Sequence, residues 1–353
     1  MRLSIISFTE NGIALSEKIA KMWQETECVL YTKCRTYDKK EHTVQPFLQS
    51  IAEWAKEQFE QRNAILFIGA CGIAVRAIAP HLTDKLSDSP VLVMDEKGQY
   101  VIPILSGHVG GANELAVLLA EKMRAQAVLT TATDIQHQFA VDLFAKKNGL
   151  AIMNKDGIAK VSSRVLAGKR ITMAIEPGHC NKDQKLPKEV ELAAYPPTQK
   201  VDVVVSSENR QFETALFLKP KEYALGIGCK KGKEAEKIET FIMRNLQIAG
   251  IAPVQVFGMA SIEVKREEEG LLAWSRKEKI PFITYSAEEL RAVKGDFHVS
   301  DFVKEQVGVD NVCERAAMKM CEPGGKLVYE KHAEDGMTIA IAKREWRVHF
   351  DEE

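Results

Sequence analysis

The chain has 353 residues, more than one ordinary hydrophobic core supports, so its length predicts two or three domains. Its formal net charge is −1, which argues against a dedicated nucleic-acid binder because such a protein needs a basic face. No apolar run reaches the length of about 18 residues that a membrane span needs. The seven cysteines show neither CxxC pairs nor zinc-site spacing and favour a reduced cytoplasmic compartment.

The first 134 residues alternate between short apolar runs and segments of helical spacing. Strands are predicted at 3–8, 28–31 and 65–68, and helices at 13–23, 47–59 and 71–79, the last one stopped by Pro80. This alternation is typical of an open, mainly parallel α/β sheet, in which ligands bind beyond the carboxyl ends of the strands. Glycine loops follow Ile68 and Leu105, so we expect both loops at that edge.

Two further apolar runs, 91–94 and 100–104, flank the turn sequence Asp95-Glu96-Lys97-Gly98 and predict a hairpin. The segment SGHVGGANE (106–114) follows and leads into an amphipathic helix with apolar positions at Leu115, Leu118, Leu119 and Met123. Its three glycines let a ligand approach the backbone, and the helix start supplies unpaired N–H groups and a positive dipole end. This combination predicts a site for an anionic ligand or group.

The segment also gathers a hydroxyl, an imidazole, an amide and a carboxylate, from Ser106, His108, Asn113 and Glu114. An imidazole ordinarily changes protonation near neutral pH, so His108 is a candidate proton carrier. Each of these residues also has a structural interpretation: His108 as a hydrogen-bonded loop histidine, Glu114 as compensation of the helix dipole, and Ser106 as a turn cap. Asp95 is expected to be a turn residue. Arg76 and Lys85 could hold carboxylates or simply lie on the surface.

A strand end is predicted at 128–131, which carries Thr130 and Thr131, and the first domain boundary is placed at 134. Helices at 138–148 and 155–167 and strands at 170–175, 201–206 and 214–218 predict a smaller middle α/β segment, residues 135–220. Residues 176–199 contain four prolines and many charges and read as an exposed excursion. We expect a connecting or covering domain here.

Residues 221–353 repeat the device of a strand that runs through glycines into a helix. The predicted strand 223–228 leads through Gly228-Cys229-Lys230-Lys231-Gly232 to a helix at 234–249. Further elements are expected at 254–258, 267–277, 282–285, 303–307, 312–320, 326–329 and 338–342, with 344–349 as an edge strand or extension. The predicted fold is therefore multi-domain α/β, with N- and C-terminal open, three-layer, Rossmann-like sheets joined by the middle segment.

The loop GIGCKKGK (226–233) fits neither familiar phosphate motif. A Walker A loop needs glycine at 227 and Ser or Thr at 234, where Ile227 and Glu234 stand, and a dinucleotide GxGxxG needs glycine at 231, where Lys231 stands. What remains is a set of backbone donors, a helix dipole and lysines, which suit carboxylates as well as phosphates. The alternatives are a tight turn with solvated lysines and, for Cys229, a small packed side chain rather than a reactive thiolate.

Taken together, these motifs resemble the CbiG family of anaerobic cobalamin biosynthesis. The N-terminal signature is GACGIAVRAIAPHLTDKLSDSPVLVMDEKGQYVIPILSGHVGGANELA followed by TTATD, and the C-terminal one comprises GIGCKKG, YSAEEL, FVKEQVGVDNVCERAA and GMTIAIAK. The resemblance therefore covers both ends of the chain and marks the middle segment weakly. Lys230 and Lys231 stand where the family often has arginines, which keeps the charge and loses the bidentate fork.

The resemblance implies a cobalt-precorrin-5A hydrolase. Its substrate is a cobalt-containing tetrapyrrole with a δ-lactone between the ring A acetate and C20. Water opens the lactone, and cleavage of a carbon–carbon bond then releases C20 with its methyl group as acetaldehyde, leaving cobalt-precorrin-5B. No protein-bound metal or other cofactor is expected, because cobalt arrives with the substrate. Transient contact with other corrin-pathway enzymes and a homodimer are left open.

From this chemistry we expect His108 and Glu114 to be the catalytic acid–base pair, without deciding which is the base. Backbone N–H groups around Gly110 and Gly111 would stabilise the oxyanion. The remaining candidates for substrate binding are Ser106, Gly107, Asn113, Gly72, Arg76, Lys85, Asp95, Thr130, Thr131, Gly228, Cys229, Lys230 and Lys231. Two other classes compete: a non-catalytic tetrapyrrole carrier or scaffold, and a sugar-phosphate or nucleotide enzyme, which the failed motif spacings disfavour.

Overall fold

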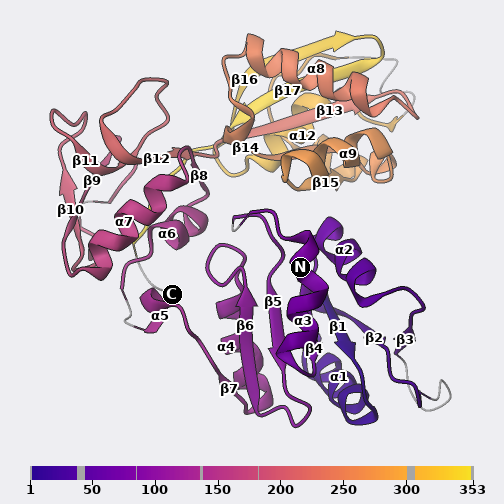
Figure 1. The fold of residues 1–353 in the computed structure, drawn as a ribbon. Coiled ribbons are helices and arrows are strands. Elements are labelled where there is room, and N and C mark those ends of the chain that lie inside the picture. The colour runs from indigo at the N-terminus through magenta and orange to yellow at the C-terminus, as the bar shows by residue number, and fades with distance from the viewer. Residues whose placement is uncertain are drawn as a thin grey trace. The chain divides into compact units, whose positions relative to one another are not determined.

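The computed structural model describes residues 2–37, 44–84, 86–135, 138–181, 183–299 and 307–350. The chain divides into two compact units, Met1–Leu143 and Phe144–Glu353, which we describe separately. Figure 1 shows one sheet in the first unit and two sheets in the second, each with helices packed on it. This architecture confirms the predicted multi-sheet α/β fold.

The first unit is built on a seven-stranded sheet with the order β3-β2-β1-β4-β5-β6-β7. Neighbouring strands are parallel except for β5 and β6, which form the predicted antiparallel hairpin. The strands are β1 Arg2–Ser7, β2 Glu27–Thr32, β3 Gln45–Pro46, β4 Ala64–Ile68, β5 Val91–Met94, β6 Tyr100–Leu105 and β7 Gln126–Ala127. The open, mainly parallel sheet inferred from the sequence is thus confirmed.

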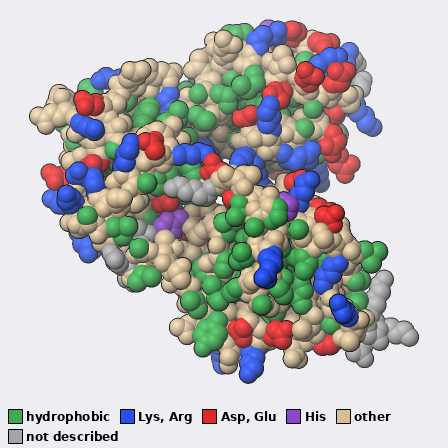
Figure 2. Space-filling view, viewed as in Figure 1, with side chains coloured by type: hydrophobic (Ala, Val, Ile, Leu, Met, Phe, Trp, Pro, Cys, Tyr) green, Lys and Arg blue, Asp and Glu red, His purple; other side chains and the backbone are tan. Residues whose placement is uncertain are grey.

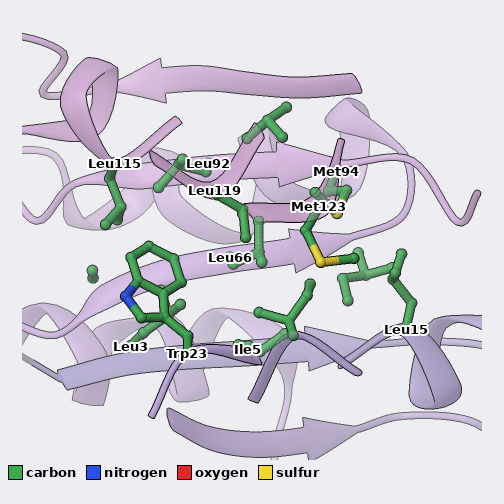
Figure 3. Packing of buried hydrophobic residues seen from close by; sticks show 14 of the residues in the cluster. Leu3, Ile5, Leu15, Trp23, Leu66, Leu92, Met94, Leu115, Leu119 and Met123 are labelled. Atoms are coloured by element: carbon green, nitrogen blue, oxygen red, sulfur yellow. The ribbon is translucent and has the colours of Figure 1, made fainter. Parts of the chain in front are cut away.

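Helices cover both faces of this sheet because the central strands are apolar on both sides. Along β4, Leu66 and Ile68 belong to the core shared with the helices α1 and α4, whereas Ile65 and Phe67 belong to the core shared with α2 and α3. Figure 3 shows Leu66 of the sheet beside Leu119 of α4. The helices are α1 Glu10–Met22, α2 Ile51–Gln61, α3 Cys71–Ile78, the 3-10 turn Ala79–His81, α4 Ala112–Met123, α5 Ala132–Ile135 and α6 Val141–Lys147, which spans the division between the units.

Capping residues decide where two of these helices begin. Thr9 accepts a hydrogen bond from the Gly12 N–H, so α1 starts at Glu10, before the predicted start at residue 13. Ser50 and Glu53 form a reciprocal capping box, so α2 starts at Ile51 rather than at Phe47. Of the apolar positions expected on α4, Leu115 and Leu119 are buried, whereas Leu118 is 47% exposed.

The hairpin reverses the chain and therefore separates the two glycine loops. Gly69 follows β4 and donates its N–H to the carbonyl of Met94 at the carboxyl end of β5. Leu105, by contrast, pairs with Val91 at the amino end of β5. β4 and β5 are four or five residues long, about 13–17 Å. The expectation that both glycine loops share one edge was wrong, because β6 runs against β4 and β5.

The second unit begins with a five-stranded sheet of order β10-β9-β11-β12-β8, in which only β8 is antiparallel to its neighbour. Its elements are β8 Leu150–Ile152, α7 Asp156–Leu166, β9 Ile171–Ile175, β10 Val190–Ala193, β11 Val201–Val205 and β12 Thr214–Pro220. Strand β10 lies within 176–199 and its Val190 is buried, so the prediction of an exposed excursion was wrong there. β10 is an edge strand with Glu191 and Leu192 exposed, a pattern too short to stand out in the sequence.

The third sheet has the order β15-β14-β13-β17-β16, with β13, β14 and β15 parallel and β17 antiparallel to both of its neighbours. Helices α8 and α9 cover one face, and α10 and α12 cover the other. The elements are β13 Tyr223–Cys229, α8 Ala235–Ile248, the 3-10 turn Pro253–Gln255, β14 Val256–Ile262, the 3-10 turn Glu263–Lys265, α9 Glu269–Glu278, β15 Phe282–Tyr285, α10 Ala287–Ala292, α12 Cys313–Met320, β16 Lys326–Glu334 and β17 Met337–Lys343. Of the segment predicted at 303–307, only Val307 lies within the described residues.

After β17 the chain crosses to the middle segment as an extension. The ring of Trp346 stacks on that of His179 with centroids 3.7 Å apart, and Val348 forms an isolated parallel bridge with Cys180. Phe350 stacks on Phe144 with centroids 4.8 Å apart. Trp346, Val348 and Phe350 are all buried, so this extension is part of the core of the second unit.

Helix α12 lies so close to β13 that only glycine fits at position 226. A Cβ added at Gly226 would lie 1.7 Å from the carbonyl oxygen of Cys313 and 2.8 Å from the backbone nitrogen of Ala317. We expect Gly226→Ala to lower the free energy of unfolding by about 1–3 kcal/mol or more, because the helix backbone must shift. Urea unfolding measures this, with Gly72→Ala as the control, since a Cβ there meets only the end of the flexible Arg76 side chain.

Candidate active site

The segment that joins β6 to α4 is wound tightly rather than extended. Ser106 has a left-handed backbone with φ 56°, and its carbonyl accepts the N–H of Ala112 at 3.1 Å. The carbonyl of Gly107 accepts the N–H of Asn113 at 3.0 Å, and the carbonyl of His108 accepts that of Gly111 at 3.0 Å. Ser106 and His108 therefore do not project from one side of an extended strand. The loop is a compact, preformed start of the helix.

Two of the loop glycines are required by this close packing. A Cβ on Gly107 would lie 2.6 Å from the side-chain oxygen of Asn113, and a Cβ on Gly110 would lie 2.3 Å from the Cβ of Ser106. Gly111 caps α4 with φ 87°, which other residues rarely adopt. The N–H of Gly111 is used within the turn, so the expectation that it donates to an oxyanion is not met in this conformation. The N–H of Gly110 has no acceptor among the described residues.

His108 lies against a carboxylate that the sequence motifs did not reveal. Its Nδ1 is 3.3 Å from an oxygen of Asp142, in the first turn of α6, and each side chain is 14% exposed. Burial acts to raise the pKa of Asp142, but the hydrogen bond and charge of His108, with backbone N–H groups, outweigh it and lower that pKa from its usual 3.8. The pair thus holds an ionised carboxylate behind an imidazole, which fixes the ring and its tautomer.

Side-chain bonds anchor the loop on both sides. The hydroxyl of Ser106 donates to the carbonyl of Asp88 at 2.9 Å, 18 residues away in the chain, so it ties the loop to another segment instead of capping its own turn. The amide of Asn113 donates to the hydroxyl of Thr131 at 3.1 Å. Glu114 follows in the first turn of α4 and is exposed. Ser106, His108, Asn113, Thr131 and Asp142 therefore form one cluster at the carboxyl end of β6, with Glu114 beside it in the chain.

Other predicted residues of the first unit lie elsewhere. Gly72 and Asp95 follow the carboxyl ends of β4 and β5, at the opposite edge of the sheet, and the guanidinium of Arg76 donates back to the carbonyl of Gly72 at 3.3 Å. Asp95 accepts backbone N–H groups of its own turn, from Lys97, Gln99 and Tyr100. The hairpin therefore separates these three residues from the 106–114 loop, and their part in substrate binding stays a prediction. Thr130 is exposed next to Thr131, and Lys85 lies outside the described residues.

The loop after β13 belongs to the second unit. The N–H of Gly232 donates to the carboxylate of Glu268 at 2.7 Å, so this donor already has an internal anion. Burial acts to raise the pKa of Glu268, but the ammonium of Lys265 and the N–H groups of Gly232 and Lys233 lower it overall. Gly228 and Cys229 end the strand, and Lys230 and Lys231 are exposed. The backbone N–H groups nearest the start of α8 are therefore already hydrogen-bonded within the protein and are not available to an external anion.

Burial raises the pKa of Cys229, in spite of the nearby Lys265 and Lys233. The thiol is therefore not an activated thiolate, which agrees with the reading of Cys229 as a packed side chain. Across the described ranges, no three His, Cys, Asp or Glu side chains are grouped so that they could hold a metal ion. Within those same ranges, every helix is too short or too polar to cross a membrane. Figure 2 shows Lys and Arg side chains interspersed with Asp and Glu on the visible face.

In the first unit, α4 connects the parallel strands β6 and β7, and the loop after β6 carries a histidine paired with a carboxylate. The protein is thus of the α/β class, with a side-chain pair that is able to transfer protons. Three sequence-family models match the chain: cobalamin synthesis G N-terminal at residues 53–134, cobalamin biosynthesis central region at 139–220 and cobalamin synthesis G C-terminus at 223–342. Together they span most of the sequence in the expected order. The chain belongs to the cobalamin synthesis G (CbiG) family, which confirms the resemblance.

Curated relatives agree with this assignment. The chain is 31% identical to a cobalt-precorrin-5A hydrolase from Priestia megaterium, over 96% of this chain and 94% of the relative. It is 32% identical to a cobalt-precorrin-5A hydrolase from Salmonella typhimurium, over 96% of this chain and 97% of the relative. A solved structure of a cobalamin biosynthesis protein G homolog from Sulfolobus solfataricus is 21% identical, with a TM-score of 0.40 over 98% of this chain and 97% of that one.

Proposed function

We propose that this chain is a cobalt-precorrin-5A hydrolase: it opens the δ-lactone of cobalt-precorrin-5A with water and releases acetaldehyde, leaving cobalt-precorrin-5B. Relatives of that name match it over nearly their whole length. The observation that carries a catalytic role, rather than mere binding, is the His108–Asp142 pair. A tetrapyrrole carrier has no use for an imidazole held by a half-buried carboxylate beside a glycine loop.

In the first step His108 is the general base. Its Nε2 accepts a proton from water, the water oxygen attacks the lactone carbonyl carbon, and the ester C–O bond breaks. Asp142 stabilises the imidazolium that forms on the other side of the ring. The N–H of Gly110 is the backbone donor placed to stabilise the oxyanion of the tetrahedral intermediate. The leaving alkoxide takes up a proton and becomes the C20 hydroxyl.

In the second step that hydroxyl loses a proton as the bond between C20 and the macrocycle breaks. C20 and its methyl group leave as acetaldehyde, and the electron pair of the broken bond stays on the macrocycle, which takes up a proton. Glu114 is our candidate for the group that exchanges protons with His108 between the two steps. It lies in the first helical turn after the loop and is exposed, so solvent can reset its protonation.

The same proposal covers partners and compartment. Cobalt belongs to the substrate, and we expect no resident metal or other cofactor. All seven cysteines are unpaired, which supports a reduced cytoplasmic setting. Contact with other corrin-pathway enzymes and a homodimer remain proposals.

Acetaldehyde release tests the function directly. Purified wild-type protein should release acetaldehyde from cobalt-precorrin-5A, and Glu114→Gln should slow that release by about 10²-fold because a proton-transfer group is lost. Glu121→Gln, an exposed carboxylate on the same helix, is the matched control and should retain full activity. Binding of the substrate by wild-type protein without acetaldehyde would identify the chain as a carrier. Full activity of Glu114→Gln would remove Glu114 from the mechanism.

A further inference from the structure

A cavity of about 360 Å³ opens at the carboxyl ends of β13 and β14, within the second unit. Its walls come from these strand ends, the start of α12 and the hairpin between β16 and β17. The carboxyl ends of parallel strands are the usual ligand site of an open α/β sheet. Neither the reaction steps described above nor the His108 cluster uses this cavity.

The inner wall of the cavity is apolar. Ile262, Val312 and Met337 line it and are 4%, 8% and 5% exposed. Two thiols complete the wall, and burial raises the pKa of Cys229 and brings that of Cys313 to about 11. Both thiols are therefore protonated at neutral pH, so the wall carries no charge and suits an unsaturated ring.

Two ammonium groups at the cavity have no salt bridge among the described residues, those of Lys230 and Lys331. The other charged residues at the cavity are engaged within the protein. Lys265 pairs with Glu268 at 2.9 Å, and Glu334 pairs with Arg244. The cavity thus combines an apolar wall with two ammonium groups outside any salt bridge among the described residues, although the charge of Lys230 also acts on the nearby carboxylate of Asp335. This pattern fits an apolar ring with carboxylate side chains.

Both lysines are held in place through their backbones. The N–H of Lys230 donates to the carbonyl of Gly336 at 2.9 Å, and the stem of Lys230 packs where a Cβ on Gly336 would be, 2.8 Å from its Cδ. The N–H of Lys331 donates to the buried carboxylate of Glu314 at 2.7 Å. The backbones of both lysines are therefore fixed on neighbouring parts of the cavity rim. This ordering before binding lowers the conformational entropy that is lost when a ligand binds.

We propose that this cavity binds one carboxylate-bearing edge of a cobalt-containing tetrapyrrole, with Lys230 and Lys331 receiving its carboxylates. Pockets for drug-sized ligands have volumes of roughly 300–1,000 Å³, so a cavity at the lower limit holds part of a macrocycle rather than all of it. The site is complete within the third sheet and its helices, and needs no residue of the first unit. The inference rests on the proposed function for its choice of ligand.

The test uses the full chain and titrates it with cobyrinic acid, a cobalt corrinoid with free carboxylates, followed by its visible absorbance. The fully methyl-esterified corrinoid is the second ligand. Lys230→Gln and Lys331→Gln should each raise the Kd for cobyrinic acid at least about tenfold, because each removes a charge-assisted hydrogen bond. Lys326→Gln, an exposed lysine on the same strand as Lys331 but outside the cavity, is the matched control and should leave the Kd unchanged.

Three outcomes would overturn the inference: no binding of cobyrinic acid by the wild type, equal binding of the ester, or an unchanged Kd in both lysine variants. Circular dichroism and thermal melting establish that each variant is folded. Hydrogen exchange on the wild type gives an independent reading, with protection by cobyrinic acid expected at 229–231 and 333–338. Absence of protection there also counts against the site.

Acetaldehyde release from cobalt-precorrin-5A, measured on the same preparations, separates this inference from the proposed function. If the wild type releases acetaldehyde and both lysine variants bind cobyrinic acid normally, the cavity assignment alone is wrong. If the wild type releases no acetaldehyde but Lys230→Gln and Lys331→Gln weaken the binding of cobyrinic acid, the hydrolase assignment is wrong and the cavity remains a tetrapyrrole site.

Discussion

Alanine in place of His108 should slow acetaldehyde release by about 10²–10⁴-fold, the usual contribution of a positioned general acid or base. The change removes the only imidazole of the loop and leaves the carboxylate of Asp142 without its hydrogen bond to that ring. Single-turnover rates with cobalt-precorrin-5A measure the effect. Near wild-type turnover would place the chemistry elsewhere in the chain.

Asp142→Asn separates the roles of the two partners. It keeps the shape of the side chain but removes the charge that stabilises an imidazolium, so kcat should fall while KM for the substrate changes little. Asp156→Asn is the matched control, since Asp156 also lies in the first turn of a helix but pairs only with exposed Lys160. Loss of binding instead of turnover would make Asp142 a substrate-binding or folding residue.

The direction of the Asp142 shift also fixes its part in the pH profile. Because the folded pKa of Asp142 is lowered from 3.8, the carboxylate stays ionised above about pH 4, and the stability from its pairing with His108 is lost only as the pH falls through the folded pKa. A kinetic limb between pH 5 and 8 therefore reports another group. Asp142→Asn should lower the plateau of the pH–rate profile, and the limb between pH 5 and 8 should still be present in this variant.

A second large effect is expected at Glu314, which is 0% exposed at the start of α12. Its carboxylate accepts hydrogen bonds from the N–H and Nδ1 of His298 at 2.9 and 2.8 Å, the amide of Asn311 at 2.6 Å and the N–H of Lys331 at 2.7 Å. Glu314→Ala leaves these donors without an acceptor, so we expect the free energy of unfolding to fall by about 3–5 kcal/mol. Urea unfolding at neutral pH measures the loss.

Glu322→Ala is the control, because Glu322 follows the same helix but forms only an exposed pair with Lys319, worth about 0–1 kcal/mol. Burial acts to raise the pKa of Glu314, but the N–H groups of Lys331 and His298 and the His298 ring lower it below 4.5 overall. The stability is therefore present above about pH 4.5 and lost as the pH falls through the folded value. The difference between wild type and Glu314→Ala should shrink in acid; a pH-independent difference would contradict this account.

The sequence predicts the elements of the fold well because their signals are local. The apolar run Ile65–Ile68 and the hairpin at 91–104 are confirmed, since strand alternation and turn residues depend on near neighbours. The edge at which each loop lies depends on strand direction through the whole sheet. That is why the loops after Ile68 and Leu105 were expected at one edge of the sheet although the hairpin separates them.

The site shows the same limit. SGHVGGANE is visible in the sequence because glycines and polar side chains lie close together in the chain. Asp142 is 34 residues beyond His108 in a helix of ordinary composition, and its contact with the imidazole is set by tertiary packing. An acidic residue in the first turn of a helix ordinarily complements the helix dipole, so nothing local marks this one as a partner of His108.

The extension that carries Trp346, Val348 and Phe350 has a consequence for the order in which the second unit is completed during synthesis. His179 leaves the ribosome 167 residues before Trp346, whose ring covers it, and Asn148 leaves 201 residues before His349, whose N–H it accepts. Domains generally fold as they emerge, N-terminal first. Part of the surface of the middle sheet therefore stays uncovered until the third sheet and the extension that follows its last strand have been synthesised.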